Sequence, residues 1–278
     1  MAAPFRVACI QNCAEEHVDR NLARAETLIR EAAGQGAELV CLPENFACLE
    51  PDEKNYIARG FDETSHPALE SMPALARELG LTLALGSLTI KRDDGRVSNR
   101  SVVLGPDGRC LATYDKIHLF DVQLRQGEMY RESATVAPGT RASLVDLPWG
   151  RLGLTICYDV RFPHLYRELA QRGADFLAIP AAFTATTGEA HWHVLVRARA
   201  IENGCFVFAA AQSGRRHWGR RTFGHSLIVD PWGAVLADAG NEEGIVVADI
   251  DPAKVGEARG MVPSLLHDRP FSLEFSAS

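Results

Sequence analysis

The sequence predicts an α/β protein with one domain and mixed parallel and antiparallel strands. An apolar strand, a helix and a second apolar strand follow one another over residues 5–42, an order that is typical of a parallel βαβ unit. Later strand-like runs are separated by turn pairs such as Asp107-Gly108, which favour antiparallel hairpins. Strand and helix patterns continue from residue 5 to residue 250 without a linker or a repeat, so we expect one domain.

The first half of the chain begins with the βαβ unit. Residues 5–10 and 37–42 are apolar runs of strand length, and a helix is predicted at 21–33, where Leu22, Ala25 and Leu28 recur at helical spacing. Glycines directly after this helix favour its end. The other elements predicted in this half are a helix at 67–79 and strands at 81–90, 101–104 and 110–114.

The second half of the chain continues the alternation. The turn Pro148-Trp149-Gly150 predicts a hairpin between strands at 144–147 and 152–156. About ten strands with several hairpins favour two packed sheets over a single open sheet. The remaining predicted elements are helices at 163–173 and 191–203 and strands at 174–179, 205–211, 223–229, 235–237 and 245–248.

Composition excludes several classes of protein. The chain has 278 residues, 46% of them hydrophobic, and a net charge of −7 without long blocks of like charge, so we expect a folded domain that does not bind nucleic acid. The longest apolar run, 205–211, is too short to span a membrane. The first six residues lack the pattern of a secretory signal, and the seven scattered cysteines fit reduced thiols, so we expect a cytoplasmic protein.

Cofactor and metal motifs are missing from the sequence. It contains neither a Gly-rich phosphate loop nor a GxSxG nucleophile turn. His191 and His193 are two residues apart, so on a helix they point in different directions and cannot hold one ion together. We therefore expect no cofactor and no metal site.

Reactive side chains follow the ends of three buried strands. Glu44 follows the strand at 37–42, Lys116 lies among apolar neighbours after a hairpin, and Cys157 lies between a strand and a helix. In α/β sheets ligands bind at such strand ends. Taken singly, each residue also has a structural explanation. Glu44 could begin a solvated loop, and Lys116 could face outward from an edge strand. Cys157 could be either an inert buried side chain or an exposed nucleophile.

Taken together and in this order, the three segments resemble the nitrilase superfamily, the carbon–nitrogen hydrolases. The similarity extends over about residues 5–269 and rests on Leu-Pro-Glu-Asn at Glu44, Tyr-x-Lys-x-His-Leu-Phe at Lys116 and Cys-Tyr-Asp-x-Arg-Phe-Pro at Cys157. Segments around residues 182–192 and 224–233 resemble the branch that contains deaminated glutathione amidases and omega-amidases.

The resemblance implies a fold and an assembly. It implies a four-layer α-β-β-α sandwich, formed by residues 1–278 as a single domain and paired through its outer helices into a homodimer or a higher homo-oligomer. It also implies a role in dimer contacts for a C-terminal tail, from about residue 265 to residue 278.

The resemblance also implies a mechanism on four residues. Glu44 would take the proton of Cys157, and the sulfur would attack a carboxamide carbon to form a thioester. The Lys116 ammonium and the Tyr158 backbone N–H would hold the oxyanion. Glu132, which matches a second glutamate of the family, would orient Lys116 or the substrate amide.

A small acid with a terminal amide is the expected substrate. Arg161 and the arginines of the segment 215–221 are candidates for its carboxylates, although a surface role explains them equally well. Deaminated glutathione fits best, followed by omega-amidase substrates such as 2-oxoglutaramate and 2-oxosuccinamate, and then by nitriles or other aliphatic amides. The substrate-binding candidates are Tyr158, Arg161, Phe183, Thr184, Thr187, Arg215 and Arg220.

Two hypotheses from other classes stay open. A binding protein on the same frame would lack the nucleophile or the base, and this chain has both. A Cys–His thiol hydrolase would pair Cys157 with His164 or His225, and replacement of that histidine would then abolish turnover.

Overall fold

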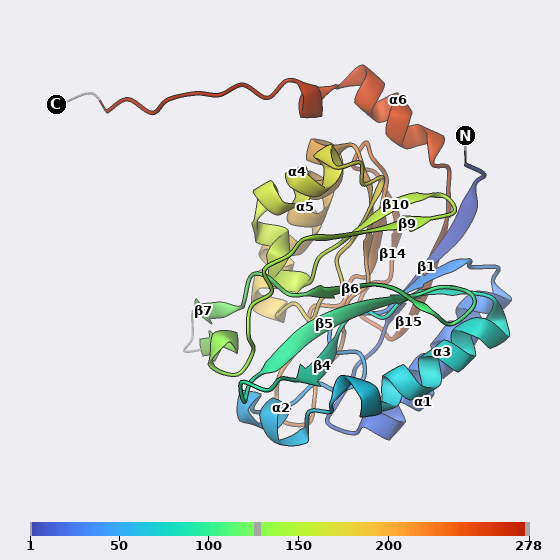
Figure 1. Cartoon of the computed structure of the whole chain (residues 1–278), viewed down its shortest axis with the longest axis vertical. Helices are drawn as coiled ribbons and strands as arrows, with labels where there is room; N and C mark the ends of the chain where they lie inside the picture. Colours follow the sequence, from blue (N-terminus) through green and yellow to red (C-terminus); the bar gives the residue numbers. More distant parts are fainter. Residues whose placement is uncertain (1, 125–128, 276–278) are drawn as a thin grey trace.

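Two β-sheets pack against each other between layers of helices (Figure 1). The computed structural model describes residues 2–124 and 129–275. Met1 and residues 276–278, which belong to the predicted domain and its tail, lie outside this part.

The first sheet contains the predicted βαβ unit. β1 (Phe5–Gln11) runs parallel to β2 (Leu39–Cys41), and α1 (Val18–Gly34) connects them. The strand order is β15-β1-β2-β3-β5-β4, and β6 also pairs with β5. The remaining strands of this sheet are β3 (Thr82–Ala84), β4 (Leu88–Lys91), β5 (Val97–Leu104), β6 (Cys110–Asp115) and β15 (Gly244–Ile250).

The second sheet has the order β14-β13-β12-β11-β10-β9. Its first two strands in sequence form the predicted hairpin, in which Gly150 pairs with Leu147. β10, β11 and β12 are mutually parallel, so their carboxyl ends meet at one edge. The strands are β9 (Ser143–Leu147), β10 (Gly150–Leu154), β11 (Phe176–Ala178), β12 (Phe206–Ala209), β13 (Leu227–Val229) and β14 (Val235–Asp238).

Helices cover the outer face of each sheet. α1 and α3 (Pro67–Leu79) pack on the first sheet, and α4 (Pro163–Gln171) and α5 (Ala185–Asn203) pack on the second (Figure 1). α1 turns its predicted apolar face, including Ala25 and Leu28, toward the sheet. This arrangement confirms the predicted four-layer α-β-β-α sandwich.

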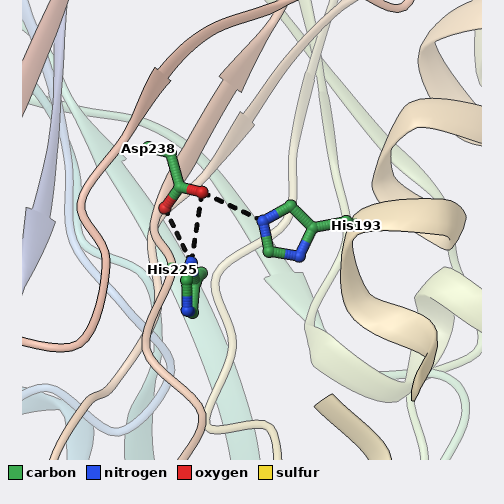
Figure 2. Close-up of side chains that lie close together, drawn as sticks. All are labelled: His193, His225 and Asp238. Atoms are coloured by element: carbon green, nitrogen blue, oxygen red, sulfur yellow. Dashed lines mark hydrogen bonds and ion pairs between the residues drawn. The ribbon is translucent and has the colours of Figure 1, made fainter. Parts of the chain in front are cut away.

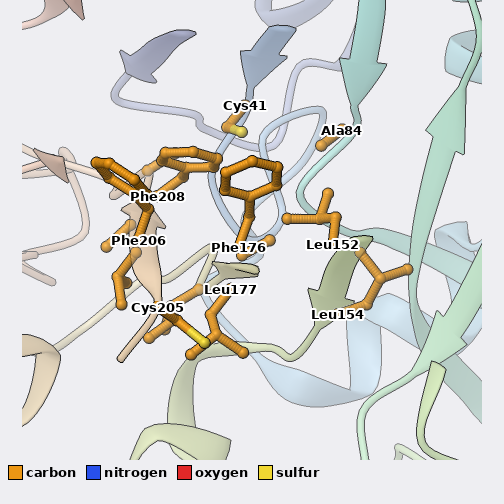
Figure 3. Packing of buried hydrophobic residues seen from close by; sticks show 14 of the residues in the cluster. Cys41, Ala84, Leu152, Leu154, Phe176, Leu177, Cys205, Phe206 and Phe208 are labelled. Atoms are coloured by element: carbon orange, nitrogen blue, oxygen red, sulfur yellow. The ribbon is translucent and has the colours of Figure 1, made fainter. Parts of the chain in front are cut away.

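The space between the sheets is filled by closely packed apolar side chains. Leu152 and Phe176 of the second sheet lie near Cys41 and Ala84 of the first (Figure 3). Phe176 also packs edge to face against Phe5, with ring centroids 5.4 Å apart. Because such a core tolerates little displacement, it fixes the strand ends of the two sheets relative to each other.

Two predicted elements differ from the observed ones. The single strand predicted at 81–90 is two strands, because the chain turns at Gly86, where φ is +45° and a Cβ would lie 2.0 Å from the Pro43 carbonyl oxygen. The helix predicted at 191–203 begins at Ala185, where the Thr184 side chain accepts from the Thr187 N–H.

Several elements were absent from the prediction. They are short or carry little apolar periodicity, so the sequence gives them no clear pattern. They are α2 (Glu53–Arg59), β7 (Asp121–Gln123), β8 (Met129–Arg131), α6 (Ala253–Met261) and the short 3-10 helices Glu63–Ser65, Glu132–Ala134, Cys157–Arg161 and Ser264–Leu266.

Beyond the 3-10 helix Ser264–Leu266, the described chain leaves the body of the protein as an extended segment (Figure 1). Its Phe271, Leu273 and Phe275 side chains are 93%, 75% and 89% exposed.

None of the helices formed by the described residues is both long enough and apolar enough to cross a membrane.

Candidate active site

The three predicted strand-end residues meet in one cavity between the sheets. Glu44 follows β2, Lys116 follows β6, and Cys157 begins the 3-10 helix after β10. Glu132 lies in the same cavity, although 88 residues separate it from Glu44 in the sequence. Two sheets thus contribute charged and nucleophilic groups to a single buried space.

Glu44 is a buried carboxylate with a full set of donors. Oε1 accepts from Lys116 Nζ at 2.8 Å and from Asn99 Nδ2 at 3.0 Å, and Oε2 accepts from the Ala182 N–H at 2.8 Å. Burial alone would raise the pKa of Glu44, but the Lys116 ammonium and these hydrogen bonds hold it below its usual value. Glu44 is therefore ionised at neutral pH.

Lys116 is 2% exposed and lies between two carboxylates. Its Nζ is 2.8 Å from Glu44 Oε1 and 3.0 and 2.9 Å from the two oxygens of Glu132. Burial would lower the pKa of Lys116, but the charges of Glu132 and Glu44 raise it well above its usual value. A permanent ammonium is thereby fixed in the cavity.

The backbone presents Cys157 in a conformation that non-glycine residues rarely adopt. Its φ is +49°, and its N–H donates to the Pro180 carbonyl at 2.8 Å. Asp159 stabilises this bend, because it accepts from the Ile156 N–H at 2.8 Å and from the Tyr114 hydroxyl at 2.7 Å. A sharp strand-to-helix bend that projects a nucleophile is thus held by buried hydrogen bonds.

The Cys157 thiol is protonated at rest. Burial, followed by the Glu44 charge, raises its pKa well above the usual value, and Lys116 opposes this only in part. Cys157 and Glu44 line the same cavity, and each shifts the pKa of the other. A carboxylate that can accept the thiol proton therefore shares the cavity with the nucleophile.

Glu132 and Asn99 complete the charged cluster. Glu132 accepts from Lys116, from the Phe120 N–H at 2.6 Å and from Asn99 Nδ2 at 3.2 Å. Asn99 thus bridges both glutamates, and the sequence analysis missed it. The available signal was a polar Ser-Asn-Arg-Ser run inside an otherwise apolar strand.

The cavity walls contain most of the predicted substrate-binding residues. Tyr158, Phe183, Thr184, Thr187 and Arg220 all line the cavity. The lining also includes residues that the sequence analysis did not select, among them Tyr56, Phe120 and Tyr130.

Arg161 and Arg215 lie outside the cavity lining. The Arg161 guanidinium stacks over the Phe183 ring at 5.2 Å and reaches His191 Nδ1 at 3.4 Å. Arg215 is exposed, and its backbone pairs with Arg221.

The arginine-rich segment 215–221 contains a buried arginine and an arginine that lines the cavity. Arg216 is 1% exposed and donates to the carbonyls of Ala14 and Ser213, so it braces the loop. Arg220 lies over the Tyr130 ring at 5.5 Å, and its buried Nε has no partner within the described residues. Arg220 also lines an outer depression together with Arg221, so it stands between the cavity and the surface.

The geometry gives no support to a Cys–His pair. The described lining of the cavity contains no histidine. His225 Nδ1 pairs with Asp238 at 2.8 Å, and the His164 ring packs against Phe162. Among the groups that line the cavity, Glu44 is placed to take the thiol proton. The arrangement of nucleophile, base and fixed cation suits acyl transfer.

Comparisons with known proteins agree with this geometry. Residues 6–260 match the family model described as carbon-nitrogen hydrolase. A deaminated glutathione amidase of Synechocystis sp. is 45% identical over 95% of this chain and 98% of its own length. The omega-amidase NIT2 of Homo sapiens is 41% identical over 93% of each chain.

A solved structure shares the fold. The NitFhit protein of C. elegans superposes with a TM-score of 0.90 at 39% identity. The match covers 97% of this chain and 66% of that longer protein.

Proposed function

The chain belongs to the carbon–nitrogen hydrolase family, and on that premise we propose that Cys157 is the nucleophile of a linear-amide hydrolase that releases ammonia or an amine. The observation that carries this proposal is that Cys157 and Glu44 line one cavity, in which a Glu44 oxygen lies 2.8 Å from the Lys116 ammonium. The enzyme class, a hydrolase of carbon–nitrogen bonds other than peptide bonds, follows from the family.

The first half of the reaction forms a thioester. Glu44 takes the Cys157 proton as the sulfur attacks the carboxamide carbon. The oxyanion that forms is stabilised by the Lys116 ammonium and by the Tyr158 backbone N–H. The protonated Glu44 then gives its proton to the departing nitrogen, and the C–N bond breaks. Ammonia leaves from a primary amide, and the amine of the peptide-like tail leaves from deaminated glutathione.

The second half regenerates the enzyme. Glu44 takes a proton from water, and the hydroxide attacks the thioester carbon. The C–S bond breaks, the acid product leaves, and the Cys157 sulfur recovers its proton from Glu44. Glu132 holds Lys116 in place through both halves, since it binds the ammonium with both oxygens.

Asn99 offers a means to recognise the amide nitrogen. Its side chain is 4% exposed, it lines the cavity, and its Oδ1 has no partner among the described residues. A carboxamide N–H is a donor that would satisfy this acceptor, whereas the oxygen of an ester would not.

We propose deaminated glutathione as the preferred substrate. Its scissile amide would lie at Cys157 and its peptide-like tail would leave past Arg220 toward Arg221, where the cavity meets the outer depression. An anionic tail fits the unpaired Nε of Arg220. The likeness to an omega-amidase keeps 2-oxoglutaramate as the second candidate.

Release of the shared acid product, 2-oxoglutarate, from both substrates, with Cys157→Ala as the blank, tests this proposal. We expect a higher kcat/KM for deaminated glutathione, and at least a tenfold increase of its KM in Arg220→Gln with little change of kcat. Arg215→Gln is the matched control, because Arg215 lies outside the cavity lining. Equal use of the shorter amide would assign omega-amidase activity instead, and no Cys157-dependent 2-oxoglutarate from either substrate would refute the proposed nucleophile.

We also propose a cytoplasmic homodimer. All seven cysteines are free thiols, which suits a reducing compartment. The exposed apolar side chains of the tail, Phe271, Leu273 and Phe275, are suited to contacts with a second copy. Sedimentation of the full chain and of a chain ending at residue 269 would test the tail's role.

A further inference from the structure

Two imidazoles face one carboxylate outside the catalytic cavity (Figure 2). His193 lies on α5, His225 precedes β13, and Asp238 ends β14. His193 Nε2 is 3.0 Å from Asp238 Oδ2, and His225 Nδ1 is 2.8 Å and 3.1 Å from the two carboxylate oxygens. One ligand atom from each residue can be chosen so that all three lie within 4.8 Å of one another.

These separations suit a tetrahedral metal ion. With zinc bonds of about 2.0–2.1 Å, neighbouring ligand atoms lie about 3.3 Å apart. The observed N–O distances are within a few tenths of an ångström of that value. Imidazole and carboxylate are ligands that zinc prefers, and a donor set with one negative charge suits a dication.

The backbone positions two of the ligands in advance. His225 has a φ of +53°, and its N–H donates to the Gly240 carbonyl at 2.7 Å. The Gly240 N–H in turn donates to Asp238 Oδ1 at 2.9 Å. The His225 and Asp238 side chains therefore face each other before any ion arrives, which lowers the cost of binding.

Solvent can reach the cluster. The side chains of His193, His225 and Asp238 are 36%, 21% and 34% exposed. An ion can enter from the surface, and a water molecule can take the fourth position.

A second group of potential ligands is less suitable. In the group Glu15, Glu16 and His217, Nδ1 of the histidine faces one glutamate and Nε2 faces the other, each at 3.6 Å. One ring cannot direct both nitrogens to a single ion, so this group makes a useful comparison in an experiment.

We propose that His193 Nε2, His225 Nδ1 and Asp238 form a zinc site that ties α5 to the β13–β14 hairpin. Trp192 connects the site to the wall of the catalytic cavity. Its Nε1–H donates to the His225 carbonyl at 2.8 Å, and its ring packs on the cavity residue Phe183 with ring centroids 4.9 Å apart. The bound ion has a structural role and takes no part in amide hydrolysis.

Calorimetric titration of the chelator-treated full chain with Zn²⁺ tests the site. We expect one ion per chain with a Kd of about 1 µM or tighter. His193→Gln and Asp238→Asn should each weaken binding at least tenfold. His217→Gln and Cys157→Ala are the controls, for the second group of ligands and for the catalytic thiol, and should bind as the natural chain does.

Thermal unfolding gives a second readout. At about 100 times the Kd, Zn²⁺ should raise the unfolding midpoint of the natural chain by about 5 °C and that of His193→Gln by no more than about 3 °C. The His193 side chain is half-buried at the surface of α5, and glutamine is similar in length, so this variant should keep its circular dichroism spectrum. Absent binding, unweakened binding in His193→Gln, or binding lost in His217→Gln would each overturn the proposal.

Discussion

Glu132→Gln provides a sharp test of the proposed charged cluster, because the substitution keeps the shape of the side chain. Each oxygen of Glu132 accepts two hydrogen bonds, one of them from Lys116 in both cases. An amide NH₂ group placed at either oxygen would face two donors. In one orientation these are Lys116 and Asn99, and in the other Lys116 and the Phe120 N–H.

The size of the effect follows from these contacts. Loss of two hydrogen bonds to a charged group costs about 1.5–3 kcal/mol each, or about 3–6 kcal/mol together. If Lys116 stabilises the oxyanion, most of this loss of free energy falls on the transition state. Each 1.4 kcal/mol lost there lowers the rate about tenfold. We therefore expect kcat to fall by two to four orders of magnitude.

Steady-state release of 2-oxoglutarate measures this change, with circular dichroism to confirm the fold. Glu78→Gln is the matched control, because Glu78 forms an exposed ion pair with Arg30 on the first sheet's helices. The control should retain full activity. A kcat for Glu132→Gln within threefold of the natural enzyme would refute the role of Glu132 as the residue that positions Lys116.

Three further predictions concern pH and packing. The pKa of Glu44 is lowered, so kcat/KM should stay constant as pH falls through about 5 and should decline only below the ordinary glutamate pKa of about 4.3. A pH–rate profile measures this decline. A decline centred near pH 6 would contradict an ionised base. Burial lowers the pKa of His66 to about 4, so the stability contributed by its neutral form is full above the unfolded pKa of about 6.5 and is lost as pH falls to 4. Urea unfolding should show a free energy of unfolding about 3 kcal/mol lower at about pH 4 than above about pH 6.5. His66→Asn should remove this pH dependence. Gly188→Ala would place a Cβ 2.3 Å from Phe223 and should cost about 1–3 kcal/mol in unfolding free energy, whereas Gly256→Ala, with nothing within 4 Å, should be neutral or stabilising; equal midpoints for the two variants would argue against the tight helix contact.

The sequence predicts the parts of the site that follow strong local patterns. Glu44 and Cys157 come directly after apolar strands, so their place at a sheet edge follows from strand order and from the rule for ligand sites in α/β folds. Motif resemblance then joined them to Lys116. All three line the same cavity, as expected from that resemblance.

Long-range contacts set the limit of such prediction. Asn99 contacts Glu44 across 55 residues, and neither side chain has a local pattern that points to the other. The same holds for the proposed zinc ligands. The spacing of His191 and His193 shows only that these two neighbours on one helix cannot bind the same ion. The partners of His193 come from a loop and a strand that lie 32 and 45 residues further along the chain.

The charge of the cluster explains how a buried thiol can be both inert at rest and reactive with substrate. Glu44, Lys116 and Glu132 sum to one negative charge, so a thiolate formed by loss of a proton to solvent would add a second charge to a buried site. Transfer of that proton to Glu44 leaves the sum unchanged. The negative charge then passes from the carboxylate to the sulfur and on to the oxyanion, and the Lys116 ammonium stays within reach throughout. The network that lowers the pKa of Glu44 and raises that of Cys157 therefore couples ionisation of the nucleophile to its attack on a bound amide, which protects the free enzyme from unspecific thiol chemistry.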